Sequence, residues 1–200
     1  MNVMIIAGYD VLANEISTHR NYVKCSFEKG VDESVDLIFT VGGATNPDYP
    51  KLTEAEANAM IIKEIKERFF GKTTILRNKK IREIPIVSLP TGNTSTDTLE
   101  AVKEYLERKA IFVDKLIICT EQSRFAGFML DALIVGLLDL SRQIIGYGHS
   151  FPESKDNFSL QRKKMMLKTL SHRSKIFRFL GSIYQKIHQR RVARIKRKEK

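Results

Sequence analysis

The sequence has little cysteine and no long apolar run, and these two shortages exclude several classes of protein. Cys25 and Cys119 are the only cysteines and show no C-x-x-C spacing, which is typical of reduced thiols rather than of a disulfide framework. Cys119 lies in an apolar run and is expected in the core. No apolar run reaches the roughly 18 residues of a membrane-spanning helix. The first residues also lack the basic flank of a secretory signal. We therefore expect a cytoplasmic protein.

Several familiar site motifs are also missing. The glycine-containing segment after the second apolar run reads GGATNP, which is not the G-x-G-x-x-G fingerprint, and neither a P-loop nor a G-x-S-x-G elbow occurs. No cluster of His, Cys and Asp has the spacing of metal ligands, so no metal site is expected. A standard dinucleotide or P-loop nucleotide site is therefore disfavoured.

Acidic residues are nearly absent from the last forty positions. Residues 161–200 hold fifteen Lys and Arg against one acid, Glu199, whereas the first 160 residues carry a small net negative charge. Three roles fit such a segment: an amphipathic helix packed on the body, a patch for anionic membrane, or an arm for nucleic acid. Its apolar residues follow a four-three spacing, broken by Arg173, and are Met166, Leu170, Phe177, Leu180, Tyr184 and Ile187. We expect the first half to pack and the last residues to stay free.

Apolar runs alternate with amphipathic segments along the first 150 residues, which predicts a three-layer α/β fold with a mainly parallel sheet. Residues 151–200 then form a polar linker and the basic tail. The last predicted helix is apolar nearly all round and is expected to be buried. The expected strands are 2–7, 37–41, 73–76, 84–87, 115–120 and 143–147. The expected helices are 13–28 (ended by Gly30), 53–70, 96–109 and 125–140.

The stretch from Asp36 to Met60 organises the predicted site. A short buried strand runs into Gly42-Gly43, and glycine lets the backbone turn sharply and approach a ligand. A polar loop and an acidic helix start follow. In an open parallel sheet, ligands bind beyond the carboxyl ends of the strands, so this pattern predicts a crevice there, with Gly42 and Gly43 as its backbone cradle.

Three charged residues are candidates for polar or acid–base work. Glu54 and Glu56 open the second helix, and only one of them can face the crevice; the register against Met60 favours Glu56. Arg20 lies on an otherwise apolar helix face, where a charge needs a partner. Glu56 and Asp97 are the expected partners of Arg20. Simple first-turn acids and a structural ion pair are the alternatives.

Further polar residues stand where predicted strands end. Asn93 and Thr94 precede the third helix, where they can cap it or leave N–H groups for an anion. Arg124 follows the strand that contains Cys119 and can grip a phosphate or carboxylate with two bonds. His149 ends the last strand and is either an acid or base, or an ordinary turn residue.

These motifs together resemble the SanA/YdcF/ElyC-like family over roughly residues 3–148. The departures are Arg124 and Gly127, which stand where the family has histidine and arginine. The matched features are an arginine before a glycine, a strand ending in Gly-Gly, an acidic helix start, a Ser-x-Asn-Thr-x-x-Asn pattern and a final Thr-Ser. The corresponding residues are Arg20, Gly30, Gly42, Gly43, Thr53, Glu54, Ala55, Glu56, Ala57, Thr91, Asn93, Thr94, Asp97, Thr120 and Glu121.

The resemblance implies a Rossmann-like fold and a link to bacterial envelope and peptidoglycan metabolism. It also implies S-adenosylmethionine as a ligand, which has been suggested for one branch, with no settled reaction. We therefore expect a domain that binds a phosphorylated or nucleotide-like small molecule. If the domain is an enzyme, this molecule is its substrate. The roles are backbone contacts from Gly42 and Gly43, anion contacts from Asn93, Thr94 and Arg124, and polar work by Glu56, Asp97 and Arg20. The alternative is a non-catalytic adaptor that binds nucleic acid or anionic membrane through residues 161–200.

Overall fold

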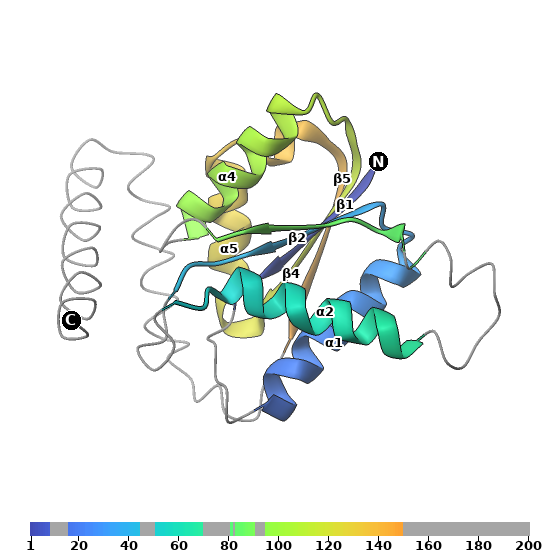
Figure 1. The fold of residues 1–200 in the computed structure, drawn as a ribbon. Coiled ribbons are helices and arrows are strands. Elements are labelled where there is room, and N and C mark those ends of the chain that lie inside the picture. Colours follow the sequence, from blue (N-terminus) through green and yellow to red (C-terminus); the bar gives the residue numbers. More distant parts are fainter. Residues whose placement is uncertain (9–15, 45–50, 70–80, 82, 91–94, 150–200) are drawn as a thin grey trace, which may run out of the picture.

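Five parallel strands form the centre of the molecule, in the order β3-β2-β1-β4-β5 (Figure 1). The computed structural model describes residues 1–8, 16–44, 51–69, 81, 83–90 and 95–149. The strands are β1 (Asn2–Ala7), β2 (Leu37–Val41), β3 (Ile86–Leu89), β4 (Val113–Glu121) and β5 (Ser141–His149). The helices are α1 (Ile16–Asp32), α2 (Glu54–Phe69), α4 (Ser95–Arg108) and α5 (Gln122–Ile134), with a short η1 (Leu138–Leu140). This is a Rossmann-like α/β fold.

The sheet is covered on both faces, as parallel sheets require (Figure 1). Side chains alternate along each strand, so β1 sends Val3 and Ile5 into one core and Met4 and Ile6 into the other. The first core packs against α4 and α5, and the second packs against α1 and α2. The strands expected at 2–7, 37–41, 84–87 and 115–120 were predicted to lie parallel in one sheet. The strand pairings confirm this prediction.

Helix α1 continues past the glycine that was expected to end it. Gly30 is buried inside the helix, where a Cβ would lie 2.6 Å from the Met4 Sδ, so the residue is small because β1 is close. The helix closes one turn later, where Val35 donates its N–H to the Gly30 carbonyl at 2.9 Å and Ser34 adopts a positive φ of 54°. The expectation that Gly30 ends the helix was therefore wrong.

Helix α5 is shorter and less enclosed than its apolar sequence predicted. It ends at Ile134, because Gly136 takes up a left-handed φ of 70° and the chain turns into η1. The side chain of Leu133 is 57% exposed, which contradicts a helix buried all round. None of the helices in the described part of the chain has the length and apolar character that a membrane crossing needs.

The boundaries of the last three strands differ from the predicted ones by one or two residues. β3 begins at Ile86 rather than residue 84, and β4 and β5 extend beyond both predicted ends. The predicted strand over 73–76 and the basic tail from residue 161 lie outside the described residues, as does the linker.

Candidate functional site

The sheet changes its winding direction between β1 and β4. The chain runs outward from β1 through β2 to β3, then returns to β4 beside β1 and continues to β5. The helices before and after this reversal cover opposite faces (Figure 1). The connections at the carboxyl ends of β1 and β4 therefore diverge, and this is the point at which open α/β sheets bind ligands. The polar side chains at this switch point are the candidate site.

Tyr22 of α1 joins the two strands at the switch point. Its hydroxyl lies 2.9 Å from the Ala7 carbonyl oxygen of β1 and 3.0 Å from the Cys119 carbonyl oxygen of β4. One hydroxyl hydrogen is shared between these two acceptors. Burial, with the nearby Cys119 thiol, raises the pKa of Tyr22 well above its usual value. Tyr22 is therefore a neutral donor at physiological pH.

A buried histidine–asparagine pair supports the same carbonyl group. The Asn58 amide of α2 donates to the Ala7 carbonyl at 3.4 Å, which leaves its Oδ1 to accept from His19 Nε2 of α1 at 2.6 Å. His19 thus carries a hydrogen on Nε2. The pair fixes α1 and α2 to the end of β1.

Glu54, the first residue of α2, is the acid that lies at the strand ends. It is buried, and its Oε2 occupies the space next to two glycines: a Cβ on Gly8 would lie 1.9 Å from this oxygen, and one on Gly42 2.5 Å from it. Gly42 also has a φ of 137°, which side chains rarely adopt. The glycines therefore make room for the chain's own carboxylate.

The backbone of Gly42-Gly43 is engaged by the same helix. The Glu54 N–H donates to the Gly43 carbonyl at 3.1 Å, and the Ala55 N–H donates to the Gly42 carbonyl at 3.3 Å. These two N–H groups of the α2 start are consequently bonded within the chain. The geometry gives the glycine pair a definite structural role, whereas its role as a ligand cradle stays a prediction.

Glu56, which the sequence favoured over Glu54, points to solvent. It forms a capping box with Thr53: its Oε2 accepts from the Thr53 N–H at 3.0 Å and hydroxyl at 2.7 Å, and its N–H donates to Thr53 Oγ1 at 3.1 Å. The side-chain and backbone bonds of Thr53 lower the pKa of the Glu56 carboxyl. The preference for Glu56 as the crevice acid was wrong.

Arg20 and Asp97 do not meet. Arg20 of α1 forms an ion pair with Glu64 of α2, so the expected pairing with Glu56 or Asp97 was also wrong. Asp97 lies exposed in the first turn of α4, on the other side of the sheet from α1. Glu64 is the partner because α1 and α2 lie side by side on the same face of the sheet, so its carboxylate is closer to Arg20 than that of Asp97.

Glu121 and Arg124 stand at the end of β4. Glu121 is the last residue of the strand and the residue before α5; its carboxylate is buried and lies 3.3 Å from the Arg124 Nε. The Arg124 side chain is 50% exposed, whereas that of Glu121 is buried. After burial and Cys119, the Arg124 charge lowers the pKa of Tyr22 and the Glu54 charge raises it. Both charges therefore act on the Tyr22 hydroxyl.

His149 reaches the same edge from β5. It pairs in register with Glu121, and its ring meets the Tyr22 ring edge-on at 5.3 Å. Its Nε2 is buried without a hydrogen-bond partner among the described residues. Burial, with the positive charge of Lys29, lowers the pKa of His149. The structure thus places this histidine beside the cluster, and its acid–base role stays a prediction.

The sequence located part of this cluster and missed the rest. Arg124 follows the end of β4 as expected, and its contact with a ligand stays a prediction, while Asn93 and Thr94 lie outside the described residues. Tyr22, His19, Asn58 and Glu121 were not predicted. A weak signal existed: Asn58 is an uncharged polar residue between two alanines on the buried face of its helix.

The chain was compared with family models, curated proteins and solved structures. No family model, no curated protein and no solved structure matches it. The resemblance to the SanA/YdcF/ElyC-like family therefore stays a prediction that the geometry neither supports nor opposes.

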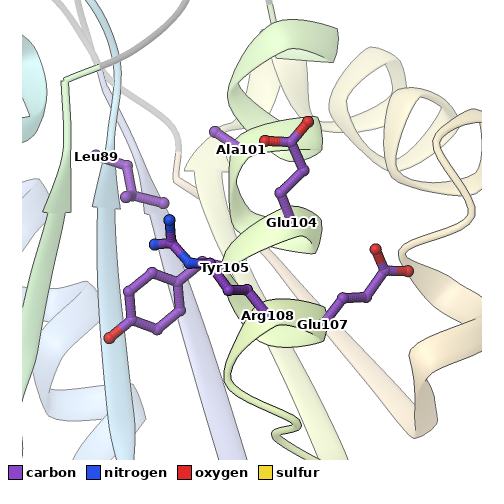
Figure 2. Close-up of a pocket in the computed structure, with 6 residues that line it drawn as sticks. All are labelled: Leu89, Ala101, Glu104, Tyr105, Glu107 and Arg108. Carbon is purple, nitrogen blue, oxygen red and sulfur yellow. The ribbon is translucent and has the colours of Figure 1, made fainter.

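A surface groove of about 440 Å³ lies away from the switch point, along α4 (Figure 2). Leu89 and Tyr105 form its apolar wall, Arg108 reaches between them, and Glu104 and Glu107 point outward from the helix (Figure 2). None of the predicted site residues that the structure describes lines it. Within the described residues, no three His, Cys, Asp or Glu side chains gather as metal ligands would.

Proposed function

We propose that the chain binds a small nucleotide-like molecule at the carboxyl ends of β1, β2 and β4. The observation that carries the proposal is the gathering of Glu54, Glu121, Arg124 and Tyr22 at the switch point of the sheet. Two buried carboxylates and a half-exposed arginine are costly to keep there for stability alone, and ionisable groups of this kind concentrate at functional sites.

The chemistry of these side chains suggests how the ligand is oriented. A carboxylate beside the strand ends accepts hydrogen bonds from ribose hydroxyls in Rossmann-like sites, and Glu54 has that position. The Arg124 guanidinium offers its planar donors to a phosphate or carboxylate. The Glu54 carboxylate lies beside Gly42 and would repel an anion at Gly42 and Gly43. The anionic end of the ligand is therefore placed at Arg124.

The proposal is one of binding, and it names no reaction. Arg124 stands where the resembling family has a histidine, and a guanidinium does not exchange protons at neutral pH. An acid–base step at that position is therefore not proposed. S-adenosylmethionine, which the resemblance implies, is one nucleoside-containing candidate among several.

The first experiment is native mass spectrometry of the purified full chain, followed by identification of any small molecule that it retains. A retained nucleoside or nucleotide supports the proposal. Retention of the same molecule at equal occupancy by the double variant Glu54→Gln/Arg124→Gln would place the ligand elsewhere.

A second candidate function rests on the charge of residues 161–200, which hold fifteen Lys and Arg against one acid. We propose as the alternative that this segment binds a polyanion, either nucleic acid or an anionic membrane. Such binding weakens steeply with salt and does not depend on Arg124, so the two candidate functions are separable.

A further inference from the structure

The groove along α4 lies beside an edge strand of the sheet. Among the described strands, β3 pairs only with β2. The Ile38 N–H donates to the Pro85 carbonyl, which therefore faces β2. Because the backbone groups of successive residues point to opposite sides of a strand, those of Ile86 and Ser88 face away from β2. They are in the position to pair with one more strand.

The α4 side of this edge is only partly covered. All four residues of β3 are half-buried, whereas all five residues of β2 are buried. Helix α4 packs above the inner strands instead, where the Tyr105 ring meets Phe39 of β2 edge-on at 5.2 Å. The groove lies between Leu89 of β3 and the side of α4 that carries Ala101, Tyr105 and Arg108 (Figure 2). Its walls therefore offer apolar contacts right next to the edge strand.

The rim of the groove is acidic. Glu104 and Glu107 line it, and Asp97 and Glu100 continue the same exposed stripe of α4 at three- and four-residue spacing. Helix α4 carries four acids against two bases. A cationic partner is therefore attracted to this surface, whereas a nucleic acid or an anionic membrane is repelled.

We propose that the outer edge of β3 and the α4 groove bind an extended basic peptide of a partner protein. The peptide adds a strand to the sheet through its backbone, as in other cases of strand addition, and its alternate side chains point to the α4 face. One apolar side chain enters the groove between Leu89 and Tyr105, and Lys or Arg side chains meet Glu104 and Glu107.

Charge favours this partner over a second copy of the chain. A two-fold contact through β3 would place the same surface patch on both sides and so bring two acidic α4 helices together. Like charges across an interface oppose such a contact. This surface is distinct from the proposed nucleotide site, so either inference can fail without the other.

The probe is a short blocked peptide that alternates lysine with valine and carries a fluorescent label. Its binding to the full chain is measured by anisotropy, with a peptide that has glutamate in place of lysine as the control. The basic peptide should bind, more weakly as salt is added, and the acidic peptide should not. Hydrogen exchange of a fragment that contains Ile86 and Ser88 should slow when the basic peptide is bound.

Two N-methylated forms of the peptide separate strand pairing from charge. Methyl groups on one set of alternate residues remove the N–H groups that face β3, and methyl groups on the other set remove those that face away. One form should therefore lose about tenfold or more in affinity, while the other should bind like the parent peptide.

The matched protein variants are Glu104→Gln/Glu107→Gln, at the groove, and Glu28→Gln/Glu67→Gln, on α1 and α2 across the sheet. Each pair removes two negative charges. The groove pair should weaken binding of the basic peptide about fivefold, and the distant pair should leave it unchanged. Equal losses in both pairs, equal binding of both N-methylated forms, or no binding of the basic peptide would overturn the proposal. A dimer seen by sedimentation in which β3 is already protected would overturn it too.

Discussion

At the residue scale, Tyr22 is the side chain that links β1 to β4, because its hydroxyl donates to the carbonyl oxygens of Ala7 and Cys119. Tyr22→Phe removes one donor from each buried carbonyl and leaves Ala7 with the longer bond from the Asn58 amide, which should lower the free energy of unfolding by about 1–3 kcal/mol. Urea denaturation measures the loss. Tyr105→Phe, in a half-buried tyrosine that packs edge-on against Phe39, is the matched control and should cost less. Equal losses would mean that the bridge contributes little.

His149 should make stability depend on pH. Burial and Lys29 lower its pKa below the usual 6.5, so the unfolded chain binds the proton more readily than the folded chain. The contribution of neutral His149 to the free energy of unfolding is therefore fully present above pH 6.5. It is lost as the pH falls from there through the lowered pKa.

The measurement is the free energy of unfolding between pH 5 and pH 8, for the wild type and His149→Phe. The variant keeps an aromatic edge against Tyr22 but does not titrate, so its stability should fall less on acidification. Parallel pH profiles would show that His149 has an ordinary pKa.

At the scale of elements, the sequence predicted well which segments are helices and which are strands, and it predicted their first and last residues less well. β1 and β2 were predicted to the residue, because each is a short apolar run with polar neighbours, buried throughout apart from Asn2. The end of α1 was misplaced because Gly30 is required by the contact with Met4, which local sequence does not reveal. The early end of α5 follows from the backbone turn at Gly136.

The capping box of α2 gives a prediction for one element. Thr53→Ala removes the hydroxyl that bonds the Glu56 N–H and carboxylate, and it should lower the free energy of unfolding by about 1 kcal/mol. The Thr53 bonds hold the pKa of Glu56 below 4.5, so the Glu56 share is present above that pH and lost as the pH falls through the lowered pKa. A cost that is unchanged between pH 7 and pH 3 would contradict this account.

At the scale of the whole molecule, the sequence predicted the sheet edge at which the strand ends meet but not which side chains gather there. The winding order and the carboxyl-edge rule put the proposed site at this edge. Glu54 and Glu56 are two positions apart and therefore point to different sides of the helix, and only the position of β1 decides between them. Arg20 was matched to the wrong acid because its true partner depends on how α1 and α2 pack.

The basic tail is predicted to act apart from the fold. Deleting residues 190–200 should leave the melting temperature nearly unchanged, because most residues of this terminal segment are charged. The same deletion should sharply weaken any salt-sensitive binding to DNA, RNA or anionic vesicles. Full-length and truncated proteins that bind these polyanions equally would exclude this segment as the binding element.

The central claim is that Arg124 at the switch point holds the anionic end of a nucleotide-like ligand. The most direct measurement is calorimetric titration of the retained nucleotide into the wild type, Arg124→Gln and Arg108→Gln, where Arg108 is the exposed arginine of the α4 groove. Loss of a charge-assisted pair should weaken binding about ten- to hundredfold in Arg124→Gln. Arg108→Gln should bind like the wild type. Wild-type affinity in Arg124→Gln, or an equal loss in both variants, would contradict the proposed site.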